Sequence, residues 1–248
     1  MDTSGTGIAV FHGFTSTPAS MQPVAAALRE AGFTVDLPLL PGHGTSWQEL
    51  QGTSRQQIAR AALASYDRLA ARCSRVVTVG LSMGGALALH VAAHRRVDAV
   101  AVINPGLRLA PLTGPAAWAL GRLRPTVASI AGDIAKPGVI EEAYAQTPLR
   151  AVVQLDLLFA QVRQELPEIR RRGTPVMLFR SGTDDVLPPS SADTLIRALP
   201  EDQLQVIHLP RSRHVATLDH EAETIHHHLL EFLHSRHPAG EPTERMAP

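Results

Sequence analysis

A serine flanked by glycines follows an apolar run in this 248-residue sequence. Residues 80–84 read Gly-Leu-Ser-Met-Gly, which is the G-x-S-x-G pattern, and Gly85 comes directly behind. A strand is predicted before the pattern and a helix after it. Such a turn can hold a serine hydroxyl above the end of a sheet, and the glycines remove side chains that would collide there. The pattern therefore predicts that Ser82 is the nucleophile of a covalent hydrolytic reaction.

The serine needs a base, because a hydroxyl is a weak nucleophile until its proton is taken. Among twelve histidines, His214 is the candidate, since it follows the last predicted strand and precedes the last predicted helix. His208 lies within a predicted strand, where packing is its expected role. The consecutive His226, His227 and His228 point in different directions on a helix and lack the i, i+4 spacing of a helical metal site.

A carboxylate must orient the base, and spacing alone leaves two adjacent aspartates open. Asp184 and Asp185 follow a predicted strand, at the sheet edge where ligands bind in parallel α/β folds. Only one of the two can face the base. Asp219 and Glu221 are weaker candidates, because acidic residues at the start of a helix are favoured by the helix dipole in any case.

The reaction also needs two prearranged N–H donors for the oxyanion. The residue after the nucleophile supplies one, so we expect the backbone N–H of Met83 in this role. The second is expected from the loop after the first predicted strand, residues 12–18 (HGFTSTP), where we choose the N–H of Phe14. A plain strand-to-helix turn is the alternative interpretation of this loop.

The elements that must position these residues alternate along the chain. Strands are predicted from short apolar, β-branched runs at 7–11, 33–37, 75–80, 97–103, 175–181 and 204–209. Helices are predicted between and after them at 19–31, 55–72, 84–94, 190–199 and 221–234. This order indicates a mostly parallel sheet of six strands flanked by helices.

The alternation stops after the fourth strand, over about residues 106–168. Two segments there are predicted as helices, 111–125 and 139–166, and the second has a wide apolar face. We interpret them as a helical cap inserted into a single domain that spans residues 1–248. The polar, proline-containing end, about 237–248, is expected to be disordered.

Composition excludes several classes of protein. The 23 Lys and Arg balance 23 Asp and Glu, so the chain lacks the basic footprint of a nucleic-acid binder. The densest basic run, Arg170–Arg172, is interpreted as a solvated helix end. The single cysteine, Cys73, excludes an intrachain disulfide framework. Without a signal-like start or an apolar run of about 18 residues, we expect a cytoplasmic protein with no stable membrane insertion.

Together, HGFTSTP, PGHGT, GLSMGG, DDVLPP and RHVATLD resemble the bacterial carboxylesterases and monoacylglycerol lipases of the α/β-hydrolase superfamily. The resemblance spans nearly the whole chain. It implies Ser82 as nucleophile, His214 as base, and Phe14 and Met83 as oxyanion donors. In that family the acid precedes one variable residue, two apolar residues and a proline, which assigns the role to Asp184.

The resemblance also implies substrate contacts in the cap. Glu141 resembles a cap glutamate that contacts a glycerol head group, with Glu142 as its adjacent alternative, and Ile130 resembles an isoleucine near the site. Six apolar cap residues could line an acyl pocket, although packing on the core is the simpler explanation for most of them: Leu107, Leu109, Leu112, Trp118, Leu120 and Leu123.

The sequence departs from the family in two places. Ser16 stands where the family often has glycine, but the donor role belongs to the backbone and is expected to survive. Strands ahead of residues 7–11 look absent, or the chain start is truncated, so six strands are expected here instead of eight.

We therefore predict a serine hydrolase that acts on esters of short to medium acyl chains, monoacylglycerols among them, through a Ser-His-Asp triad and an acyl-enzyme. No metal or organic cofactor is expected. The expected partner is a small-molecule ester, with no nucleic acid and at most a second copy of the chain as a homodimer. A thioesterase, an amidase or peptidase, an acyltransferase and a non-catalytic binding protein remain alternatives.

Overall fold

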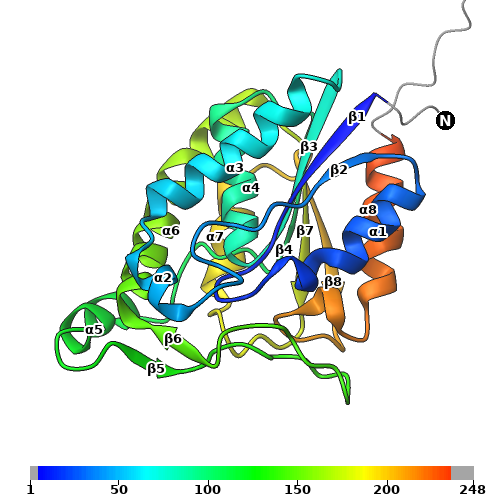
Figure 1. Ribbon diagram of the computed structural model, residues 1–248. Coiled ribbons are helices and arrows are strands. Elements are labelled where there is room, and N and C mark those ends of the chain that lie inside the picture. The colour runs from blue at the N-terminus through cyan, green and yellow to red at the C-terminus, as the bar shows by residue number, and fades with distance from the viewer. Residues whose placement is uncertain (1–4, 236–248) are drawn as a thin grey trace, which may run out of the picture.

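A parallel six-stranded sheet lies at the centre of the molecule (Figure 1). The computed structural model describes residues 5–235, so the expected disordered tail, 237–248, lies outside the described residues. All five strand pairs of this sheet are parallel, in the order β2-β1-β3-β4-β7-β8. The strands are β1 (Thr6–Phe11), β2 (Thr34–Asp36), β3 (Arg75–Leu81), β4 (Ala99–Ile103), β7 (Val176–Ser181) and β8 (Leu204–Leu209). The predicted parallel six-stranded sheet is confirmed.

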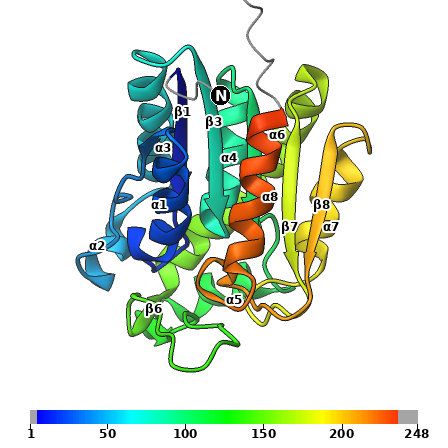
Figure 2. The same cartoon turned by 90° about the vertical axis from the view of Figure 1, so that its right-hand side faces the viewer.

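Helices cover both faces of this sheet (Figure 2). One face carries α1 (Gln22–Glu30) and α8 (Ala222–Ser235), and the other carries α3 (Arg55–Ala70), α4 (Met83–His94), α6 (Leu149–Arg172) and α7 (Ser190–Ala198). Successive side chains of a strand point to opposite faces, so β1 contributes to both apolar cores. Ile8 packs in the core beside α1 and α8, and Phe11 packs in the core beside α3 and α4. The short α2 (Trp47–Gly52) was not predicted.

The segment between β4 and α6 lies beyond the carboxyl ends of the strands (Figure 1). It holds α5 (Thr113–Leu120) and a two-stranded antiparallel sheet made of β5 (Thr126–Ala128) and β6 (Gln146–Pro148). Figure 1 places it below the sheet, at the edge where the strand-to-helix loops emerge. The sequence predicted only helices here, and the small sheet was missed.

The predicted helix 139–166 is wrong at both ends. α6 begins at Leu149, ten residues later than its predicted start, because Pro148 has extended backbone angles (φ −75°, ψ 125°). A residue that precedes a proline is also disfavoured in the helical region, and Thr147 lies in β6. The helix continues past its predicted end to Arg172, where Gly173 adopts φ +64° and ends it. The interpretation of Arg170–Arg172 as a helix end is confirmed.

Within residues 5–235, no helix is both long enough and apolar enough to cross a bilayer.

Candidate active site

Ser82 lies in the sharp turn between β3 and α4. Its backbone angles, φ +56° and ψ −117°, fall in a region that non-glycine residues rarely adopt. The glycines allow this turn: a Cβ on Gly80 would lie 2.0 Å from the carbonyl oxygen of Gly84, and a Cβ on Gly84 would lie 2.0 Å from that of Phe11. Ser82 occupies the N-cap position of α4, but its hydroxyl does not cap the helix. The hydroxyl is therefore available for chemistry.

His214 and Asp184 come together from two separate loops at the carboxyl edge of the sheet. His214 Nδ1 lies 2.7 Å from Asp184 Oδ2, and both side chains are mostly buried. The other oxygen of Asp184 accepts hydrogen bonds from the backbone N–H groups of Val186 (2.9 Å) and Leu187 (2.7 Å). These bonds fix the carboxylate, and the carboxylate fixes the imidazole ring.

The other acidic candidates do not contact the ring of His214. Asp185 forms an ion pair with Arg213 at the surface. Asp219 accepts hydrogen bonds from the backbone N–H groups of Ala135, Lys136, Arg213 and His220. These bonds outweigh the effect of burial and lower the pKa of the Asp219 carboxyl. Glu221 binds the loop before His214, through Arg211 N–H and Ser212 Oγ.

The loop HGFTSTP lies against the nucleophile. A Cβ on Gly13 would lie 3.7 Å from Ser82 Cβ, which is ordinary van der Waals contact. Met83 is the first residue of α4, so its N–H has no intrahelical partner. Within residues 5–235, the N–H of Phe14 has no hydrogen-bond partner either. Both expected oxyanion donors are therefore free to bind a ligand.

A buried histidine supports this loop. His12 is fully buried, with Nδ1 3.0 Å from the Gly13 carbonyl oxygen and Nε2 accepting the N–H of Leu40 at 3.2 Å. This pattern assigns the proton to Nδ1 of a neutral ring. Burial, followed by the neighbouring His43, lowers the pKa of His12 to about 3. Burial likewise lowers the pKa of His43 to about 4.

Asp133, from the inserted segment, connects the loops that carry the acid and the base. Its Oδ2 accepts the backbone N–H of Asp185 (2.9 Å) and of His214 (3.2 Å). Its Oδ1 accepts a hydrogen bond from Arg213 Nη1 at 3.0 Å, and its backbone carbonyl accepts the N–H of Val215. Sequence reasoning missed this residue, since an isolated aspartate in an irregular segment carries no recognisable pattern.

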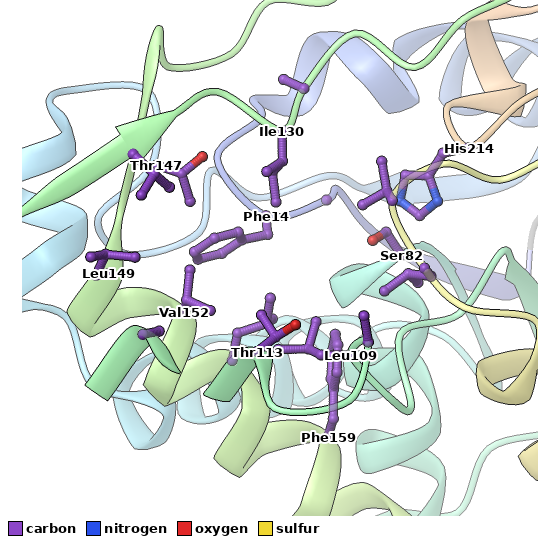
Figure 3. Close-up of a pocket in the computed structure, with 18 of the residues that line it drawn as sticks. Phe14, Ser82, Leu109, Thr113, Ile130, Thr147, Leu149, Val152, Phe159 and His214 are labelled. Atoms are coloured by element: carbon purple, nitrogen blue, oxygen red, sulfur yellow. The ribbon is translucent and has the colours of Figure 1, made fainter. Parts of the chain in front are cut away.

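A mostly apolar cavity of about 400 Å³ opens beside the serine. Figure 3 shows Ser82 and His214 at one end of it and Thr147, Leu149 and Val152 toward the other. Phe14 projects into the cavity between the two ends. The cavity is therefore elongated away from the serine.

Some of the cap residues predicted to contact substrate line this cavity, and others do not. Glu141 and Ile130 line it, whereas Glu142 does not. The Glu141 carboxylate accepts the N–H of Gly132 at 2.8 Å. Of the six apolar candidates, Leu109 and Leu120 line the cavity, and Leu107 is buried in the core. The other three are exposed: Leu112, Trp118 and Leu123.

Much of the cavity wall comes from α6 and was not assigned to the site from sequence. The apolar face of this helix was recognised, but none of its residues was assigned to the site. Val152 and Phe159 belong to that face and line the cavity, as does Thr147 just before the helix. No residue-type signal distinguishes an apolar side chain that faces a cavity from one that faces the core.

Residues around Ser16 join the loop HGFTSTP to the inserted segment. Ser16 is fully buried and pairs with Ala143 in an isolated antiparallel bridge, and the N–H of Tyr144 donates to the Thr15 carbonyl oxygen at 3.0 Å. A serine in place of glycine is thus accommodated without closing the cavity at this point.

Comparison with known proteins identifies relatives of the whole chain. The alpha/beta hydrolase family matches residues 8–226. The chain is 36% identical over 227 residues to the thermostable monoacylglycerol lipase of Bacillus sp. (strain H-257), covering 91% of this chain and 89% of that protein. It is 25% identical over 236 residues to a carboxylesterase of Bacillus subtilis (strain 168), covering 91% of each.

Solved structures give the same relationship. A structure from work on the metagenome-derived lipolytic enzymes LipS and LipT aligns with a TM-score of 0.89 and 31% identity, covering 94% of this chain and 95% of that chain. The match to the family over most of the sequence, together with these relatives, shows that the chain belongs to the alpha/beta hydrolase family.

Proposed function

We propose that this protein is a serine hydrolase that cleaves carboxylic esters, with Ser82 as nucleophile, His214 as base and Asp184 as the acid that orients it. The observation that carries the proposal is the 2.7 Å contact between His214 Nδ1 and Asp184 Oδ2, made beside a serine held in a strained turn. The relatives named as a monoacylglycerol lipase and a carboxylesterase support ester hydrolysis.

In the proposed mechanism, Nε2 of His214 takes the Ser82 proton as Oγ attacks the ester carbonyl carbon. The carbonyl oxygen becomes the oxyanion and is stabilised by the N–H groups of Phe14 and Met83. The imidazolium returns its proton to the leaving alcohol as the C–O bond breaks, which leaves an acyl-Ser82. Water, deprotonated by His214, attacks the acyl carbon and releases the carboxylic acid. Asp184 stays ionised and stabilises the imidazolium.

The cavity lining supports a neutral, mainly apolar substrate. Glu141 and His214 are its only titratable side chains among the described residues, and neither Lys nor Arg lines it. A polyanionic carrier group, as in many acyl thioesters, would find no cation there, which favours a neutral ester over this alternative. We propose an acyl chain in the elongated part of the cavity and the alcohol group near Ile130 and Glu141. A monoacylglycerol has this distribution of apolar and hydroxyl groups.

We also propose that residues 106–168 act as a cap that shapes this cavity. The proposed cap, which comprises the inserted segment and most of α6, supplies Leu109, Leu120, Val152 and Phe159 to the wall, whereas Ser82 and His214 come from the sheet loops. Selectivity for chain length is therefore assigned to the cap and bond cleavage to the sheet loops.

A panel of p-nitrophenyl esters of increasing chain length, assayed beside 1-monoacylglycerols and a matched acyl thioester, tests the function. We expect hydrolysis of the esters, and loss of nearly all of it in Ser82→Ala with the fold retained by circular dichroism. A fluorophosphonate probe should label the wild type and not the variant. An active Ser82→Ala protein would refute the assigned nucleophile, and a preference for the thioester would refute the assigned substrate class.

A further inference from the structure

Three side chains with metal-binding atoms meet between α4 and α6. His90 Nδ1 lies 2.8 Å from Glu165 Oε2, and His94 Nε2 lies 3.0 Å from Glu165 Oε1. The three ligand atoms all lie within 4.8 Å of one another. Along α4, His90 and His94 are roughly 12 and 18 Å from Ser82 at 1.5 Å per residue, so this cluster is separate from the proposed active site.

The helix geometry explains why these side chains converge. His90 and His94 are four residues apart on α4, so they lie on one face of the helix, and their ring centroids are 4.4 Å apart. Glu165 reaches them from the facing helix α6. Gln161, one turn earlier on α6, donates an Nε2–H hydrogen bond to Glu165 Oε1 at 2.9 Å. It can therefore orient the carboxylate as an outer-shell partner orients a metal ligand.

Within the described residues, the Glu165 carboxylate has no permanently charged partner. The Glu165 side chain is only 14% exposed, and within residues 5–235 its ion-pair partners are the two histidines, with neither Lys nor Arg among them. Arg172, about two turns further along α6, is bound instead to the Glu168 carboxylate and to the carbonyls of Ala92 and Arg95. A buried carboxylate is costly without a positive partner, and the C-terminal turns of a helix favour cations.

We propose that His90, His94 and Glu165 bind a divalent transition-metal ion, for which Zn²⁺ fits best, and that this ion links α4 to α6. Two imidazoles and one carboxylate are a ligand set that Zn²⁺ accepts, with water as the fourth ligand. Ligand atoms about 2.0–2.1 Å from a tetrahedral Zn²⁺ lie roughly 3.3 Å apart. The two nitrogen–oxygen pairs, 2.8 and 3.0 Å apart through different oxygens of Glu165, are close to this spacing. All the ligand atoms lie within 4.8 Å of one another, so the largest approach needed is about 1.5 Å. The exposed ring of His94 leaves the site open to solvent.

The proposed ion is structural. It holds the nucleophile-bearing helix α4 against α6, and it touches none of the reacting atoms assigned above. Binding to the folded state alone should raise the melting temperature, by about 5–10 °C at a Zn²⁺ concentration 100 times the dissociation constant. The rate of ester hydrolysis below the melting transition should change by less than about twofold.

The test uses the full chain without an affinity tag, stripped with a chelator and titrated with ZnCl₂ by calorimetry. We expect one ion per chain in the wild type, and a loss of affinity of at least about 100-fold in His94→Ala and in Glu165→Gln. A double variant, His227→Ala with His228→Ala, is the matched control, because these histidines contact Glu231 on α8 and should leave the site unchanged. The visible absorption of bound Co²⁺ should report tetrahedral ligation in the wild type and in the control.

Absence of stoichiometric binding in the wild type would overturn the proposal, as would equal affinity in His94→Ala. Loss of binding in the control but not in His94→Ala would show that the ion binds on α8, and this result would also overturn the proposal. Because ester hydrolysis is measured on the same preparations, failure of the metal site and failure of the proposed hydrolase are distinguishable.

Discussion

Nδ1 of His214 lies 2.7 Å from Oδ2 of Asp184, and the adjacent Asp185 turns away to pair with Arg213. Two identical side chains, consecutive in the sequence, thus occupy different environments. One is fixed by two backbone N–H groups and faces the base, whereas the other is 61% exposed. Because their contacts differ, the same Asp→Asn substitution should have different effects at the two positions.

Asp184→Asn should lower kcat for ester hydrolysis by about 10³–10⁴-fold, because the amide cannot hold the imidazole in the required tautomer. Asp185→Asn should change kcat by less than about threefold, since an exposed ion pair contributes roughly 1 kcal/mol or less. Steady-state kinetics on both variants, with matching circular dichroism spectra, makes the comparison. Equal and mild losses would show that the acid lies elsewhere.

Asp133 is expected to act as a positioning residue, through the N–H groups of Asp185 and His214. Asp133→Ala should lower kcat at least about tenfold with little change in KM, because it loosens the acid and base loops and leaves the cavity wall intact. Asp133→Asn keeps one carbonyl-type acceptor and should recover part of the rate. The control is Asp67→Asn, whose partner is the surface residue Arg95. A purely structural role would lower the melting temperature of Asp133→Ala and leave kcat unchanged.

Val152→Phe should shorten the acyl chain that the enzyme prefers. Each methylene that the cavity buries contributes about 0.8 kcal/mol, or roughly fourfold in kcat/KM. Filling the far end should remove that gain for long chains and leave short esters nearly unaffected. The same ester panel measures the effect, with Leu157→Phe, on the exposed side of α6, as control. An unchanged chain-length profile would place the acyl chain outside this cavity.

Ser82→Gly and Ser82→Ala should both be inactive but should differ in stability. The backbone of Ser82, at φ +56° and ψ −117°, suits glycine and strains a residue with a Cβ by about 1–3 kcal/mol. The glycine variant should therefore have a larger free energy of unfolding than the alanine variant, by roughly 1–2 kcal/mol. Urea denaturation of the pair measures the difference. If the two variants had the same free energy of unfolding, the backbone at residue 82 would carry no strain.

Stability should fall on acidification because His12 and His43 are buried in their neutral forms. Their folded pKa values, about 3 and about 4, lie below the ordinary value of 6.5, so the unfolded chain binds more protons between pH 6.5 and pH 4. The stability they confer is complete above pH 6.5 and is lost as the pH falls. At pH 5 the loss from both should be about 4 kcal/mol relative to pH 7.

Urea unfolding at pH 7 and pH 5 measures this loss. His43→Phe removes one of the two groups, so the difference between the two pH values should shrink by roughly half. His208→Phe, at an exposed position on β8, is the matched control and should retain the full difference. Identical unfolding free energies at both pH values would contradict the buried neutral state.

The sheet could be predicted because each strand carries its own local signal. Runs such as Ala99–Ile103 are apolar at successive positions, and turns separate them from helical patterns. The turn at Ser82 was recognisable for a similar reason, since its glycines lie within six consecutive residues, 80–85, and each prevents a definite collision with the backbone. Local sterics of this kind can be read from residue types alone.

The inserted segment could not be predicted to the same extent. Pro148 placed the start of α6 ten residues later than the helical pattern suggested, and β5 and β6 are too short to show any alternation. Asp133 and Phe159 are assigned to the site only by tertiary contacts, which depend on where the chain returns to the sheet. From the sequence, the choice between Asp184 and Asp185 required a family resemblance, whereas in the fold a hydrogen bond distinguishes them.

The inserted segment is tied to three loops at the carboxyl edge of the sheet and to the start of α8. Tyr144 binds the loop HGFTSTP, Asp133 binds the loops of Asp184 and His214, and the N–H of Ala135 donates to Asp219 before α8. The inserted segment therefore cannot be exchanged as an independent cassette. A chimera that takes the corresponding segment from a relative would also replace the residues that support the loops of Asp184 and His214. Engineering of chain-length selectivity in this enzyme should proceed by substitutions along α6, whose cavity-facing side chains can be varied without cutting these connections.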